Sequence, residues 1–163
     1  MTDTPAPTAL TTLDYLLDEI RATSSLLRVA DLARSGRRPW WRNLFFGVVR
    51  TPSEVSADLG VQYLGENIDR ARDHWREAMS LGAELHRMFP TNEVVVRLGE
   101  DLDRVGFREV IPLLQHDAIP HRVAEAAVHL ADVLDKIREC DRLVADTRKQ
   151  LMLQRARDVG PNT

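Results

Sequence analysis

The feature that most constrains the fold is a stripe of ten apolar or small residues whose spacings alternate between three and four. An average step of 3.5 residues keeps side chains on one face of an α-helix, so this stripe predicts a helix of about five heptads packed along another helix. The stripe comprises Ala57, Val61, Leu64, Ile68, Ala71, Trp75, Ala78, Gly82, Leu85 and Phe89. We therefore expect a protein of long helices that pack on one another.

Start and stop signals divide the chain into four helical segments. A capping box of Thr11 and Asp14 predicts the start of the first helix, and Gly36 suits the position after its end. Thr51 as cap with Pro52 in the first turn predicts the start of the helix that carries the stripe. The expected helices span residues 11–35, 51–89, 93–113 and 120–157.

Each of the other segments carries an apolar stripe of its own. The third segment is expected to bend or break at Gly106 and Pro112. In the fourth, Asp141 and Arg148 interrupt the register, as happens when a straight helix drifts from an exact heptad. The expected core residues are Leu13, Leu16, Leu17, Ile20, Leu27 and Ala30, then Val95, Leu98, Leu102 and Val105, then Val123, Ala127, Leu130, Leu134, Ile137, Val144 and Leu151, with Cys140 and Thr147 on a slightly rotated face.

These signals predict an all-α fold. We expect an up-and-down bundle of about four helices, with two coiled-coil-like helices of about 38 residues and a short aromatic connector helix. A single domain is expected over residues 11–158, between disordered tails at 1–10 and 159–163.

Composition narrows the class of protein. With 44% hydrophobic and 29% charged residues, the chain has the composition of a soluble protein. The sequence contains no apolar run near the roughly 20 residues that span a bilayer, and residues 1–9 lack the features of a secretory signal. Cys140 is the single cysteine, so we expect a cytoplasmic protein without disulfides. Twenty Arg against two Lys is typical of a GC-rich bacterial genome.

A basic and aromatic segment, residues 37–50, is the first candidate site. Residues 28–50 carry six Arg and one Asp, whereas residues 51–119 carry 13 acids against seven Arg. Large aromatics among basic residues fit a hot spot for a protein partner, a nucleic-acid surface or peripheral contact with a membrane. A buried plug at the end of the bundle is the interpretation without a binding role. The candidate partner-binding residues are Arg37, Arg38, Trp40, Trp41, Arg42, Phe45 and Phe46.

The end of the fourth helix is basic. Cations near a helix C-terminus are favoured by the helix dipole, which explains them without a binding role. Together with the segment 37–50 they would form a second strip of a nucleic-acid path. The candidate phosphate-contacting residues are Arg138, Arg142, Lys149, Arg155 and Arg157.

The sequence evidence for a metal site is weaker than that for the two basic candidate sites. His121, Glu125 and His129 stand four residues apart on one helix face, and imidazole and carboxylate groups are ligands for zinc and iron. Three side chains in line spread over about 12 Å, too far for one ion, so a second helix would have to supply ligands. A solvated polar face is the simpler interpretation. Cys140 lies in the apolar stripe and is expected to be inert. We therefore expect no catalytic, cofactor-binding or metal-binding residues and no cofactor.

The expected lengths of the helices lead to a function. Two helices of about 38 residues would outreach the other two, so part of their stripes would lack cover within the chain. Exposed apolar stripes usually indicate a partner or a second copy. We expect a non-enzymatic assembly or adaptor protein that binds itself or another helical protein. The alternative is a small helical nucleic-acid-binding subunit of a bacterial nucleoprotein complex of the defence type, and a metal-dependent hydrolase is the remote alternative.

Overall fold

The protein is all-helical in the part that the structure describes. A computed structural model describes residues 8–34, 52–120 and 123–158, with side chains over 8–28, 65–120, 125–126 and 128–158. Its α-helices are α1 (Ala9–Arg34), α3 (Pro52–Met88), α4 (Glu93–Val105), α5 (Val110–Leu113) and α6 (Val123–Asp158). These ranges contain no strand, so the all-α prediction is confirmed.

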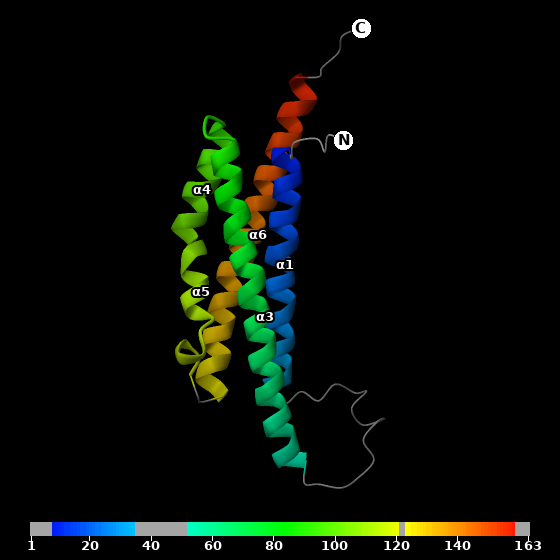
Figure 1. Cartoon of the computed structure of the whole chain (residues 1–163), viewed down its shortest axis with the longest axis vertical. Coiled ribbons are helices and arrows are strands. Elements are labelled where there is room, and N and C mark those ends of the chain that lie inside the picture. The colour runs from blue at the N-terminus through cyan, green and yellow to red at the C-terminus, as the bar shows by residue number, and fades with distance from the viewer. Residues whose placement is uncertain (1–7, 35–51, 121–122, 159–163) are drawn as a thin grey trace, which may run out of the picture.

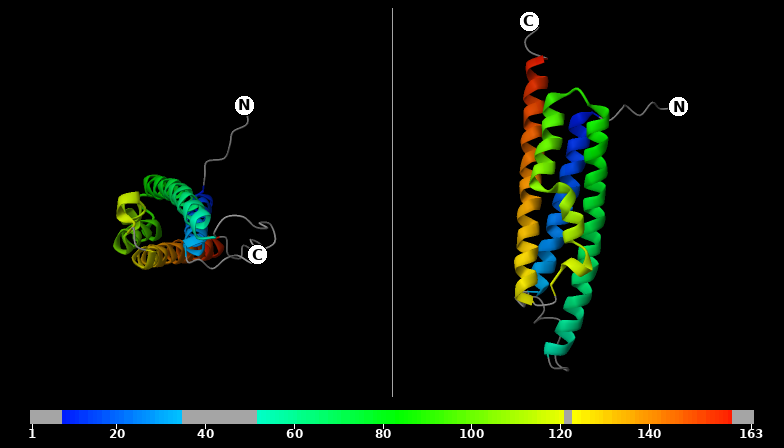
Figure 2. Two further views of the ribbon diagram at one scale, coloured as in Figure 1. Left: turned by 90° about the horizontal axis from the view of Figure 1, so that it is seen from below. Right: turned by 90° about the vertical axis from the view of Figure 1, so that its left-hand side faces the viewer.

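The helices surround one core in antiparallel order. Figure 1 shows α1 and the α4–α5 segment running in one direction, and α3 and α6 in the other. α1 packs against α3 and α6, and the α4–α5 segment packs against the same two helices from the opposite side. The end-on view in Figure 2 shows the resulting ring of four columns. Each column therefore has two neighbours and one outward face.

The finer expectation for the fold is not confirmed. The described residues hold five α-helices rather than about four, because α4 ends at Gly106 and the chain resumes as α5 after a 3-10 turn, Phe107–Glu109. A second 3-10 turn, His116–Ala118, precedes α6. The side chains of the first part of the long stripe, with Ala57, Val61 and Leu64, lie outside the described ones. The aromatic connector helix, residues 1–7 of the N-terminal tail and the tail 159–163 also lie outside the described residues.

The α4 boundaries follow the sequence signals. The Asn92 side chain accepts hydrogen bonds from the backbone N–H groups of Val94 (3.1 Å) and Val95 (3.3 Å), which caps the N-terminus. At the other end, Gly106 has a left-handed φ of 90° and its N–H bonds back to the carbonyl of Asp103 at 3.1 Å. The predicted interruption at Gly106 is therefore confirmed.

The predicted capping box of the first helix is wrong. The helix begins at Ala9, and the hydroxyl of Thr8 accepts from the backbone N–H of Thr11 at 3.2 Å. Ala9 and Leu10, assigned above to the tail, are partly buried against the core. Asp14 pairs with Arg148 of α6 instead of capping α1. The earlier start adds apolar contact to the bundle, which Thr11 as cap would forgo.

The predicted stripes supply most of the core. On α3 the side chains of Ile68, Ala71, Trp75, Ala78 and Leu85 are buried, and so are the expected residues of α1, α4 and α6 whose side chains are described, except the partly buried Val105. The described members of the α6 stripe, from Leu130 to Leu151, are all buried, so the expected uncovered part is not found among them.

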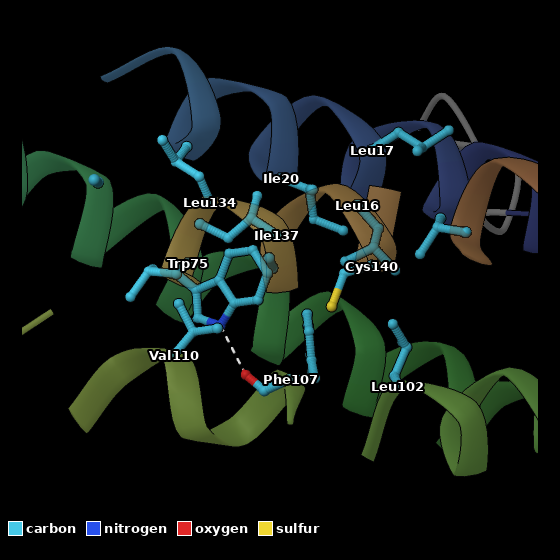
Figure 3. Packing of buried hydrophobic residues seen from close by; sticks show 14 of the residues in the cluster. Leu16, Leu17, Ile20, Trp75, Leu102, Phe107, Val110, Leu134, Ile137 and Cys140 are labelled. Atoms are coloured by element: carbon cyan, nitrogen blue, oxygen red, sulfur yellow. Dashed lines mark hydrogen bonds between the residues drawn. The ribbon is translucent and has the colours of Figure 1, made fainter. Parts of the chain in front are cut away.

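Trp75 is the largest side chain at the centre of this core. It is 0% exposed, and its indole N–H donates to the Phe107 carbonyl at 2.9 Å (Figure 3). The Phe107 ring lies 4.9 Å from the indole, centroid to centroid, with the two planes tilted by 55°. The break after α4 therefore supplies both a ring and an acceptor to Trp75.

Replacing Trp75 with Phe should lower the free energy of unfolding by about 1–3 kcal/mol for the lost hydrogen bond alone, and the smaller ring adds a cavity cost. Urea unfolding followed by circular dichroism measures it. Tyr15→Phe is the matched control because Tyr15 is 58% exposed, and it should change stability by less than about 0.5 kcal/mol. Equal effects of the two substitutions would contradict the central role of Trp75.

Two glycines should respond to alanine in opposite ways. Gly106→Ala should cost about 1 kcal/mol or more, because φ is positive and the new Cβ would lie 2.6 Å from Glu109 Oε2. Gly99→Ala in α4 should gain about 0.5–1 kcal/mol, because no neighbouring atom lies within 4 Å of the new Cβ. A Gly106→Ala variant with a urea midpoint equal to or above that of the wild type would contradict the left-handed cap at Gly106.

Candidate interaction surfaces

The basic aromatic segment stays a prediction. Its candidate partner-binding residues, Arg37, Arg38, Trp40, Trp41, Arg42, Phe45 and Phe46, lie outside the described residues. Among the described residues, the candidate surfaces are on the outward sides of the helices and at their ends.

The candidate phosphate-contacting residues fall into two groups. Arg138 pairs with Asp135, and Arg142 pairs with Glu139 and Asp146 of the same helix. The hydrogen bond from Arg142 lowers the pKa of the Glu139 carboxyl. Because acids of the same helix already hold these two guanidinium groups, a phosphate would have to compete for them. The other group, Lys149, Arg155 and Arg157, is exposed near the end of α6.

Two ion pairs join α6 to α1. Arg148 pairs with Asp14, and Arg21 Nε donates to Asp141 Oδ1 at 2.8 Å. Asp141 and Arg148, which interrupt the apolar register of α6, thus meet charged partners on α1 at the edge of the core. A groove of about 340 Å³ lies between these pairs. It is lined by Asp14, Leu17, Asp18, Arg21, Ala145 and Arg148.

The metal-site candidates are not brought together. His129 Nε2 bonds to the Leu113 carbonyl at 2.8 Å, so this ring holds α5 against α6. Glu125 is exposed, and His121 lies outside the described residues. Over the described ranges, no group of three His, Cys, Asp or Glu side chains is placed to hold a metal ion.

Cys140 has the environment of an inert thiol. Its side chain is fully buried, and burial raises the pKa of the thiol to about 12. A thiol needs its thiolate form to act as a nucleophile, and at neutral pH this form is very rare here.

The C-terminal end of α6 carries two exposed apolar residues, Met152 and Leu153, that the sequence analysis did not single out. Figures 1 and 2 show this end running past the other helices. Every residue from Met152 to Asp158 is exposed, and Met152 and Leu153 are 47% and 52% exposed. Val128, near the other end of α6, is 63% exposed. The available signal was that these three large apolar residues stand off the core stripe.

Comparison with known proteins adds no family or fold relative. No protein-family model, curated protein or solved structure matches this chain. Among the helices that the structure describes, none combines the length and the apolar character needed to cross a bilayer.

Cys140 should resist thiol reagents in the folded protein at about pH 8 and still at about pH 10, because its pKa is about 12. It should react at once in urea. An added exposed cysteine, Tyr15→Cys, is the control and should react in the folded state, because Tyr15 is 58% exposed. Rapid labelling of native Cys140 would contradict its burial.

Proposed function

We propose that this chain is a non-enzymatic helical assembly protein that docks a helical partner, either a second copy or another protein. The observation that carries the proposal is the end of α6, which runs past the bundle with Met152 and Leu153 exposed. A cytoplasmic location is part of the proposal and is supported by the single cysteine. The proposal also includes the fuller form of the fold, in which the stripe of α3 continues as a coiled-coil-like seam through Ala57, Val61 and Leu64.

The physical reason is that helices need packing. In proteins most of the stability of a helix comes from tertiary packing of its apolar face, and only a small part from intrinsic propensity. The residues of α6 beyond Leu151 are all exposed within the chain. A partner helix that covers Met152 and Leu153 would provide the missing contact and bury apolar surface.

Nucleic-acid binding is the second candidate. Exposed Lys149, Arg155 and Arg157 near the end of α6 favour it, since phosphate contacts dominate such binding. The ion pairs of Arg138 and Arg142 with acids of their own helix count against a continuous path along α6. Binding of this kind would fall steeply with salt.

The double substitution Met152→Ser with Leu153→Ser tests the assembly proposal. Size-exclusion chromatography with light scattering should give a defined oligomer for the wild type, with little absorbance at 260 nm. The dissociation constant of the oligomer should be roughly tenfold higher for the double variant, because two apolar side chains are lost from the interface.

The control is Tyr15→Ser, which removes an exposed apolar side chain from α1 and should leave the oligomer unchanged. A wild-type monomer would contradict self-association. A peak rich in 260 nm absorbance that disappears at high salt would favour the nucleic-acid candidate instead.

A further inference from the structure

The outward side of α6 carries a second stripe with the same average step of 3.5 residues. Its spacings alternate between four and three, and it lies on the side of the helix opposite the buried stripe. We call it the outer stripe. It comprises Val128, Asp132, Asp135, Glu139, Arg142, Asp146, Lys149 and Leu153.

The outer stripe has exposed apolar ends and a charged middle. Val128 and Leu153, at its two ends, are 63% and 52% exposed. Three acids come first in the middle part, and Arg142, Asp146 and Lys149 come after them. The first half is therefore acidic, and both cations lie in the second half.

This pattern is complementary to itself when one copy is reversed. In an antiparallel pair, Val128 faces Leu153 of the second copy, Asp132 faces Lys149, and Glu139 faces Arg142. A parallel pair would instead place Asp132 against Asp132 and Lys149 against Lys149. The antiparallel contacts are reciprocal, because residue i meets j and j meets i, and a two-fold axis produces this arrangement.

We propose that the outer stripe is the surface through which two copies of this chain pair, with their α6 helices antiparallel about a two-fold axis near the middle of the stripe. The inference rests on the proposed assembly function and names its partner and its surface. The heptad spacing lets both helices keep contact along the whole stripe, over about 37 Å.

The remaining pair is of like charge. Asp135 would face Asp146 of the second copy, but each of these carboxylates already has an Arg of its own helix. Arg138 pairs with Asp135, and Arg142 Nη1 lies 3.4 Å from Asp146 Oδ2. These guanidinium groups offset the repulsion between the two acids.

Charge reversal tests the pairing. Asp132→Lys and Lys149→Glu each place like charges together at two symmetric positions, so each variant alone should dimerise about tenfold more weakly. An equimolar mixture of the two should recover the dimer. In the mixed pair the introduced lysine of one variant faces the introduced glutamate of the other, and the unchanged Lys149 of the first faces the unchanged Asp132 of the second. Sedimentation velocity at low salt measures this, and wild-type dimerisation should weaken with added salt.

A disulfide provides a second measurement. The double variant Val128→Cys with Leu153→Cys should form a covalent dimer on mild oxidation, while each single variant should not. Cys140 is buried and should not take part in the cross-linking. Cross-linking of the single variants would indicate a parallel pair and overturn the inference.

The outcomes separate the two proposals. A wild-type dimer that neither charge reversal weakens would overturn the outer stripe but leave the assembly function standing on another surface. A wild type that stays monomeric at low salt would overturn the outer stripe together with self-association. Recovery of the dimer in the mixture supports both.

Discussion

The burial of Trp75 places a demand on the rest of the bundle. A fully buried indole N–H needs an acceptor, and the carbonyls inside a regular helix are already bonded. The left-handed cap at Gly106 ends α4 and sets the next residues into a 3-10 turn, where the Phe107 carbonyl accepts from the indole at 2.9 Å. The Phe107 ring also approaches Gly82, whose added Cβ would lie 3.6 Å from it. The broken helix is thus how the bundle accommodates its largest side chain.

The ion pairs between α1 and α6 set register more than stability. Pairs between partly exposed side chains contribute about 0–1 kcal/mol each. The two partners on α1, Asp14 and Arg21, stand seven residues apart, and so do Arg148 and Asp141 on α6. Because seven residues are two helical turns, both pairs form together in one antiparallel register, and a slip of one turn would lose both. Asp141 and Arg148, which interrupt the apolar heptad of α6, thus align α6 with α1.

The apolar periodicity and the helix start and stop signals predicted the all-α class, the buried residues of α3 and the break at Gly106. These features are set locally by residue spacing and backbone conformation. The choice of Thr8 over Thr11 as cap is not local, since it depends on Ala9 and Leu10 packing against the core. The contact of Trp75 with Phe107 joins residues 32 apart and leaves no mark in spacing. The long helices were expected to outreach the others, but Met152 and Leu153 were not singled out because the sequence does not show where the neighbouring helices end.

The outer stripe shows why a 3.5-residue step alone does not identify a core. α6 carries two such stripes on opposite sides; the apolar one is buried, and the charged one faces outward. A straight helix drifts by about 20° per heptad, and because both stripes drift together they stay opposed along the helix. Since the described core is covered within one chain, a second copy would contact the outer stripe, which is mainly charged and has an apolar residue at each end. Association through such a face is sensitive to salt and selective for the reversed orientation, unlike an obligate apolar seam.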